Sequence, residues 1–188
     1  GFHRFYISVN YLADQIQGYF GDGHNHGISI QYLRERQALG TAGSLSLLPR
    51  PLVSPCVVVN GDLLTRVNFE QMLEFHEKGG YSLTIGVKEY PLQLPFGVVR
   101  TQADRVVEFR EKPSETRLIN AGVYILSPDV VDLVPQDRHY DMNLLIEQVM
   151  CRTEGHVGAF RIHEYWMDIG TAPDYQQAQW DYPTHFSQ

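Results

Sequence analysis

The first sixty residues alternate between strand-like and helix-like segments, and this alternation restricts the fold more than any other feature of the chain. Residues 5–10 and 28–33 have the pattern of strands, and residues 11–20 between them have the pattern of a helix. A short helical stretch at residues 42–48 precedes a β-branched run at residues 56–59, which is typical of a strand buried on both faces. This order predicts a parallel sheet covered by helices.

The rest of the chain contains several strands that have no helix between them, which predicts an antiparallel addition to the sheet. The expected strands are residues 81–88, 96–101, 106–111, 118–126 and 157–162. Asn68, Asp141 and Thr171 each stand where they can cap a following helix. We therefore expect an α/β protein with a mixed sheet.

Length and composition fit one ordinary globular domain spanning residues 1–188. The net charge of -7 argues against nucleic acid as a partner, because nucleic acids usually bind basic surfaces. The sequence has no apolar run near the roughly 18 residues of a membrane span, and no signal peptide is visible. The cysteines at 56 and 151 are expected to be buried free thiols, which fits a cytoplasmic location.

Two aspartates stand at positions suited to a magnesium ion. Asp62 follows the buried strand directly, at the end where open α/β sheets bind ligands, and Gly61 lets the backbone turn there. Asp168 stands just before a helix start. Carboxylate oxygens suit Mg²⁺, a hard cation. A loop aspartate that caps a turn and an acid that stabilises a helix N-terminus are the structural alternatives.

Four further motifs offer groups for a sugar or a nucleotide. Small residues at 40–43 allow a flat base to lie against the backbone, where exposed N–H groups could read its edge. Lys112 could neutralise a phosphate, and Glu111 could accept hydrogen bonds from sugar hydroxyls. Asn120 offers a donor and an acceptor, and Gly97 offers its N–H group. Ordinary turns and a solvated charged edge are equally open interpretations of these motifs.

The motifs LGTAGS, NGD, PFG, EKP, NAGVY and WMDIGT follow one another in this order along the chain. In this order the sequence resembles the sugar-1-phosphate nucleotidylyltransferases over residues 1–182, nearly its whole length. It looks most similar to the mannose-1-phosphate guanylyltransferase type. The resemblance implies a three-layer, Rossmann-like nucleotide-diphospho-sugar transferase fold.

The resemblance also implies roles for individual residues. Nucleotidyl transfer from a nucleoside triphosphate to a sugar 1-phosphate would use Asp62, Lys112 and Asp168, with Mg²⁺ held by Asp62 and Asp168. The residues that would line the nucleotide base pocket are Gly40, Thr41, Ala42 and Gly43. The residues that would contact the sugar are Gly97, Glu111, Asn120 and Gly122. Lys112 would contact the sugar phosphate.

One departure from the family pattern concerns the start of the chain. The family signature begins with a first strand, a glycine-rich loop that carries a basic residue, and a lysine soon after, and these lie upstream of the segment matched by residues 5–10. We therefore expect a partial catalytic domain that is inactive alone. The absent strand would also leave a strand edge that a second copy of the chain can cover, giving a homo-oligomer.

Two other functions compete with nucleotidyl transfer. A glycosyltransferase of related fold would have two acids spaced one residue apart at the strand end, whereas Asn60 and Asp62 stand there. A regulatory homologue would bind sugar nucleotides without turning them over. The joint presence of Asp62, Lys112 and Asp168 argues against that reading.

Overall fold

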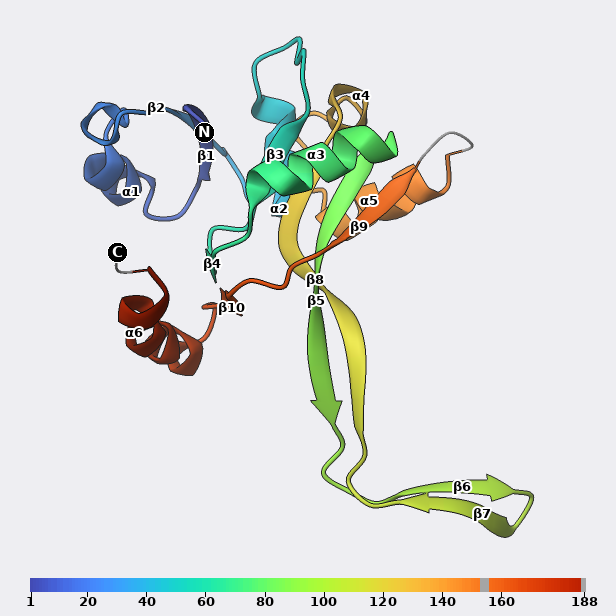
Figure 1. The fold of residues 1–188 in the computed structure, drawn as a ribbon. Helices are drawn as coiled ribbons and strands as arrows, with labels where there is room; N and C mark the ends of the chain where they lie inside the picture. The colour runs from blue at the N-terminus through green and yellow to red at the C-terminus, as the bar shows by residue number, and fades with distance from the viewer. Residues whose placement is uncertain (153–155, 187–188) are drawn as a thin grey trace. The chain divides into compact units, whose positions relative to one another are not determined.

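A computed structural model describes residues 1–152 and 156–186, whose strands form four sheets (Figure 1). Strands are β1 Arg4–Val9, β2 Ser29–Arg34, β3 Cys56–Val59, β4 Leu63–Thr65, β5 Leu83–Gln93, β6 Val98–Gln102, β7 Arg105–Arg110, β8 Ser114–Leu126, β9 Val157–Arg161 and β10 Trp166–Asp168. Helices are α1 Ala13–Phe20, α2 Gly40–Gly43, α3 Phe69–Gly79, α4 Pro128–Val131, α5 Met142–Met150 and α6 Ala172–Phe186, with 3₁₀ turns η1 His24–His26 and η2 Ser44–Leu47. The mixed α/β fold that the sequence predicts is confirmed.

Contacts between residues divide the chain into two units. Unit 1 contains residues 1–60, 68–84 and 124–158, and unit 2 contains the three remaining segments. Apart from Val123, the largest fully buried side chains belong to unit 1 and include Met72, Leu83, Ile125, Leu126, Leu145 and Val149. Unit 1 therefore contains the larger part of the hydrophobic core.

The first two strands form a parallel pair in unit 1, as the sequence predicts. β1 and β2 pair in parallel from Arg4 opposite Ser29 to Val9 opposite Arg34, with α1 as the connection. The helix begins at Ala13 rather than at residue 11, because Leu12 has a left-handed φ of 56° that a helix cannot include.

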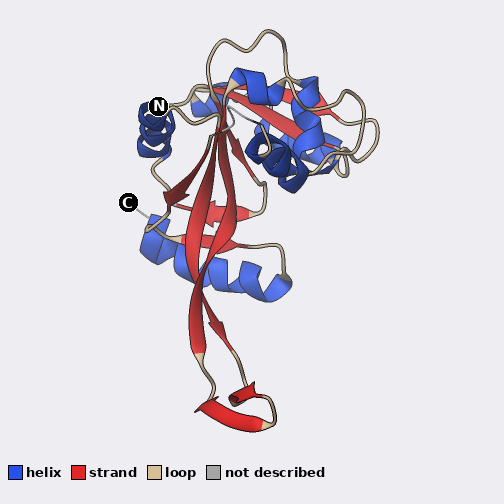
Figure 2. Cartoon of the chain, turned by 90° about the vertical axis from the view of Figure 1, so that its right-hand side faces the viewer, coloured by secondary structure: helices blue, strands red, loops and turns tan. Residues whose placement is uncertain are grey.

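The third strand belongs to a different sheet, whose strand order is β3-β8-β5-β9. Figure 2 shows the long strands β5 and β8 side by side. Within the described residues, β1 has β2 as its strand neighbour and β3 has β8, so each leaves one edge without strand pairing. The single parallel sheet expected for the first half is therefore divided between two sheets.

Helix α3 begins and ends at the residues that its sequence predicts. The Gln71 N–H donates to Asn68 Oδ1 at 3.0 Å, and Gly80 takes the left-handed conformation that ends the helix. His76 lies on the buried face, where its ring nitrogens meet the hydroxyls of Thr84 at 2.9 Å and Ser127 at 3.1 Å. Desolvation by burial lowers the pKa of His76, so the ring is neutral near neutral pH.

Both cysteines are free, as expected, but they differ in exposure. Cys56 is partly buried, and burial raises the pKa of its thiol to about 11. Cys151 is exposed, so its expected burial is wrong. The residue is the C-cap of α5, where its side chain lies outside the apolar stripe of that helix.

Unit 2 contains two small antiparallel ribbons and the last helix. β4 pairs with β10, and β6 pairs with β7 as a hairpin. Helix α6 is capped by Thr171, whose hydroxyl oxygen accepts from the Asp174 N–H at 3.4 Å. The Tyr165 hydroxyl donates to Asp181 of α6 at 2.8 Å and so ties this helix to the segment before β10.

Candidate functional site

Asp62 and Asp168 meet at one end of the β4–β10 pair. Asp62 directly precedes β4 and Asp168 ends β10, where the antiparallel register sets it opposite Leu63. The Ile169 N–H donates to the Asp62 carbonyl oxygen at 2.8 Å. The two acids converge as the sequence predicts, while their role as metal ligands stays a prediction.

Both carboxylates lie close to Gly170. A Cβ atom added to Gly170 would lie 3.0 Å from Asp168 Oδ1 and 3.5 Å from Asp62 Oδ2, so the two oxygens cannot be farther apart than the sum of these distances. The Gly170 N–H donates to Asp168 Oδ1 at 2.8 Å and fixes the orientation of this carboxylate. Both carboxylates belong to residues exposed to solvent.

This pair of carboxylates suits magnesium. Mg²⁺ binds oxygen at about 2.0–2.1 Å and is commonly held by one or two carboxylates together with substrate phosphates. Groups of three or more potential metal-ligating side chains are absent from the described part of the chain. The residues present therefore fit an ion that completes its coordination with phosphate oxygens and water.

Gly97 and Glu111 lie together at the open end of the β6–β7 ribbon, directly before β6 and directly after β7. A Cβ atom on Gly97 would lie 2.9 Å from Glu111 Oε2 and 2.7 Å from the Phe109 ring. A larger residue at this position would have to displace the exposed Phe109 ring. The exposed Glu111 carboxylate remains able to accept hydrogen bonds, as its expected role in sugar binding demands.

Lys112 has an unusual backbone conformation. Its φ of 43° is left-handed, which costs a residue with a side chain about 1–2 kcal/mol. The next residue is Pro113, whose carbonyl accepts from the Leu94 N–H at 3.1 Å and pins the segment to the end of β5. Strain of this kind often marks functional positions, and it sets the direction in which the Lys112 side chain leaves the backbone.

Asn120 and Gly122 form a bend within β8. The Gly122 N–H donates to Asn120 Oδ1 at 3.0 Å, and Gly122 has a φ of 68° that requires glycine. The Trp166 indole N–H donates to the Ala121 carbonyl at 2.8 Å. The strand that ends at Asp168 therefore lies against the stretch of β8 that the sequence predicts to bind sugar.

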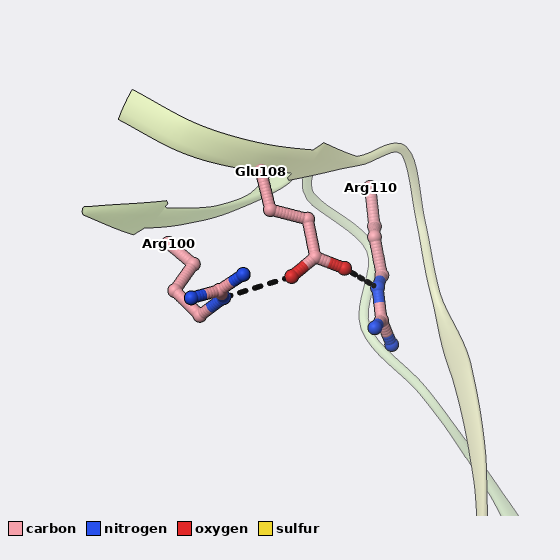
Figure 3. Close-up of polar contacts among 3 residues, drawn as sticks. All are labelled: Arg100, Glu108 and Arg110. Carbon is pink, nitrogen blue, oxygen red and sulfur yellow. Dashed lines mark hydrogen bonds and ion pairs between the residues drawn. The ribbon is translucent and has the colours of Figure 1, made fainter. Parts of the chain in front are cut away.

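The opposite face of the β6–β7 ribbon carries a paired charge cluster (Figure 3). Glu108 accepts from Arg100 Nε at 2.8 Å and from Arg110 Nε at 2.5 Å, and these hydrogen bonds, led by that from Arg100, lower the pKa of Glu108. The cluster borders a shallow depression of about 230 Å³. The depression is lined by Leu94, Val98, Arg100, Glu108, Arg110, Pro113 and Glu115. Glu108, Arg100 and Arg110 therefore form a charged edge of the ribbon.

The turn at Gly40–Gly43 belongs to unit 1, and its glycines pack against another segment of that unit. A Cβ atom on Gly40 would lie 2.5 Å from Asp141 Oδ1 and 2.9 Å from the Tyr140 carbonyl oxygen. A Cβ atom on Gly43 would lie 2.8 Å from the Arg138 carbonyl oxygen. Both glycines therefore allow close approach of residues 138–141.

The backbone N–H groups of Thr41, Ala42 and Gly43 are already hydrogen-bonded. Ala42 and Gly43 donate to the Tyr140 carbonyl at 3.0 and 2.9 Å, and Thr41 donates to Asp141 Oδ1 at 3.2 Å. The expectation that these amides are free to read a base edge is wrong, because the 138–141 segment takes them. A base could still lie against the turn, so the role of Gly40, Thr41, Ala42 and Gly43 in nucleotide binding stays a prediction.

Glu35 holds the start of the same turn, a role that the motifs of the sequence do not predict. Its carboxylate accepts from the Leu39 N–H at 2.8 Å and from the Ser8 hydroxyl of β1 at 2.5 Å. An acid five residues before the first glycine of a small-residue turn is the local sign that could have identified it. Glu35 therefore links the turn to the β1–β2 sheet.

A family model described as nucleotidyl transferase matches residues 1–185. The chain belongs to the nucleotidyl transferase family. The resemblance inferred from the six ordered motifs is thereby confirmed. The match covers both units and every candidate site residue.

Relatives within this family carry different specificities in their names. The chain is 32% identical to a UTP–glucose-1-phosphate uridylyltransferase of Synechocystis sp., over 95% of this chain and 51% of the relative. It is 31% identical to a mannose-1-phosphate guanylyltransferase of Mycobacterium tuberculosis, over 96% of this chain and 52% of the relative. The chain therefore spans about half the length of these relatives.

Solved structures of similar fold support the architecture. The HddC structure from Yersinia pseudotuberculosis aligns with a TM-score of 0.69 at 24% identity, covering 97% of this chain and 80% of that one. This likeness confirms the nucleotide-diphospho-sugar transferase fold. None of the helices in the described ranges is both long and apolar enough to cross a membrane.

Proposed function

We propose that the protein transfers a nucleotidyl group from a nucleoside triphosphate to a sugar 1-phosphate, releasing pyrophosphate and a sugar nucleotide. The observation that carries the proposal is the convergence of Asp62 and Asp168 beside Gly170. Family membership supports it, because the relatives named above are uridylyl and guanylyl transferases that act on sugar 1-phosphates. In the reaction, a sugar-phosphate oxygen attacks the α-phosphorus and the bond to pyrophosphate breaks.

The residues of this chain would act by positioning and by charge neutralisation. Asp62 and Asp168 would hold Mg²⁺, and the Gly170 N–H keeps the Asp168 carboxylate oriented for that purpose. When bound, the ion would neutralise phosphate charge and orient the phosphates. The protein would hold the two reactants in line, which converts an encounter in solution into an intramolecular step.

Unit 2 also supplies the groups proposed for the sugar phosphate. Lys112 would pair with its phosphate as a point charge, and its left-handed backbone would aim the side chain. Glu111 and Asn120 would accept hydrogen bonds from sugar hydroxyls. The Gly122 N–H donates to Asn120 Oδ1, and this hydrogen bond orients the Asn120 side-chain amide within β8.

For the base and sugar, we propose GTP and mannose 1-phosphate. The order of the six motifs and the residues within them support this pair. UTP with glucose 1-phosphate is the competing pair, because a relative of nearly equal identity carries that name.

A substrate matrix tests the proposal. The whole protein, with every residue that its gene encodes, would be incubated with Mg²⁺ and each combination of four ribonucleoside triphosphates with glucose, mannose and heptose 1-phosphates. We expect at least one combination to yield pyrophosphate and a sugar nucleotide in equal amounts, detected by mass spectrometry. Triphosphate that survives every combination, or that is hydrolysed at the same rate without a sugar phosphate, would contradict the proposed reaction.

A further inference from the structure

The Gly40–Gly43 turn and the start of α5 exchange hydrogen bonds with one another. The Thr41 N–H donates to Asp141 Oδ1 at 3.2 Å, and the Met142 N–H donates to the Thr41 hydroxyl oxygen at 2.8 Å. The position of Asp141 directly before α5 predicts that its own side chain caps this helix. In the structure Asp141 does occupy the N-cap position, but its side chain makes no capping hydrogen bond. Thr41 supplies the cap from a distant part of the chain, which leaves the Asp141 carboxylate to hold the turn.

Several contacts converge on the same Asp141 oxygen. Oδ1 lies nearest to the point where a Cβ atom of Gly40 would stand, and His139 Nε2 lies 3.8 Å away from it. The Asp141 side chain is 42% exposed, so solvent reaches the carboxylate from one side. The carbonyl oxygen of the neighbouring Tyr140 accepts hydrogen bonds from two further amides of the turn, and the Tyr140 N–H donates to the Leu39 carbonyl oxygen at 2.8 Å. The turn is therefore fastened along its length to residues 140–142.

Orientation of the turn depends on this fastening. Two glycines give the turn backbone freedom, which is lost only when its amides are bonded. A flat base can lie reproducibly on a small-residue turn only if the turn is held in one conformation, because binding otherwise costs the entropy of ordering it. The Asp141 side chain accepts a hydrogen bond from an amide in the middle of the turn, that of Thr41.

We propose that Asp141 is a positioning residue for the nucleotide: its carboxylate, together with the Thr41 hydroxyl, holds the Gly40–Gly43 turn in the conformation that receives the base. The inference rests on the proposed function. Asp141 acts through Thr41 and does not itself contact the substrate.

Steady-state kinetics of the whole protein test the role of Asp141, with both substrates varied. Asp141→Ala removes the acceptor for the Thr41 N–H, so we expect the KM for the triphosphate to rise about three- to tenfold, the value of one hydrogen bond. The KM for the sugar 1-phosphate should stay within about twofold. Asp141→Asn retains an acceptor oxygen and should restore most of the nucleotide KM. Glu147→Ala, at an exposed position of the same helix, is the matched control and should behave as the wild type.

A second substitution approaches the same pair from the other side. Thr41→Val removes the hydroxyl that receives the Met142 N–H and should raise the triphosphate KM in the same range, which keeps the test decisive if Asp141→Ala does not fold. Unchanged triphosphate KM in a folded Asp141→Ala or Thr41→Val protein would overturn the inference. An equal rise in both KM values would also overturn it, because a general structural defect produces that pattern. A wild-type protein that makes no sugar nucleotide would overturn the proposed function itself. An active wild type whose Asp141→Ala variant keeps the same triphosphate KM would overturn only the role of Asp141.

Discussion

Replacing Gly40 with alanine tests whether its glycine serves packing or ligand access. Gly40 has a φ of 77°, so any side chain there costs about 1–2 kcal/mol of backbone strain. The new Cβ atom would also lie 2.5 Å from Asp141 Oδ1 and 2.9 Å from the Tyr140 carbonyl oxygen. Separating the two segments would weaken the hydrogen bonds that Ala42 and Gly43 donate to Tyr140, each worth about 0.5–1.5 kcal/mol.

Gly27 serves as a control that separates the cost of backbone strain from the cost of a steric clash. Gly27 has a φ of 69°, and an added Cβ atom there meets nothing within 4 Å. We therefore expect Gly40→Ala to lower the free energy of unfolding by about 1–3 kcal/mol more than Gly27→Ala, measured by urea unfolding with circular dichroism. Hydrogen exchange at the amides of residues 42 and 43 should accelerate in Gly40→Ala alone. Equal unfolding free energies for the two variants, within about 0.5 kcal/mol, would refute the packing role of Gly40.

Three further predictions concern side chains elsewhere in the protein. Lys112→Ala should raise the KM for the sugar 1-phosphate by a factor equivalent to about 1.5–3 kcal/mol and leave triphosphate binding unchanged. The exposed Lys78→Ala is the control, and equal effects of the two variants would count against the assignment of Lys112 to the sugar phosphate. The pKa of His76 is lowered in the folded protein, so the unfolded chain binds the proton first and the free energy of unfolding should fall as pH drops below about 6.5. His76→Gln should flatten this part of the pH profile of unfolding, and an unaltered profile would disprove the contribution of His76. Asn68→Ala should cost about 1 kcal/mol in urea unfolding, because the Gln71 N–H loses its acceptor, and Asn68→Ser should recover most of that loss unless the cap is dispensable.

Local patterns in the sequence predict those parts of the fold that depend on neighbouring residues. The cap of α3 joins Asn68 to the Gln71 N–H three residues away, and the parallel β1–β2 pair follows from two short strands around one helix. Both were predicted because the interacting groups lie within one pattern. The start of α1 lies at Ala13, two residues after the predicted start, since the left-handed φ of Leu12 leaves no compositional sign.

Contacts between distant segments account for what the sequence could not reveal. β4 and β10 have three residues each, too few for a periodic pattern, yet their pairing is what brings Asp62 to Asp168. The motif order anticipated that convergence only through the family resemblance. The bonded amides of the Gly40–Gly43 turn were missed for the same reason, because their acceptors lie at residues 140 and 141. Asp141 was taken for a local helix cap since nothing in its own segment indicates Thr41.

We propose that Asp62 and Asp168 together hold the magnesium ion used in nucleotidyl transfer. Pyrophosphate release by Asp62→Asn and Asp168→Asn in the whole protein, measured across a range of Mg²⁺ concentrations, tests this role directly. Each substitution removes a negative charge from the pair at nearly constant volume, so the rate should fall by about a hundredfold or more. The Mg²⁺ concentration needed for half-maximal rate should rise in both variants. Asp104→Asn, at the exposed tip of the β6–β7 hairpin, should leave both quantities unchanged. Release at the wild-type rate and the wild-type Mg²⁺ dependence in either variant of the pair would contradict the account.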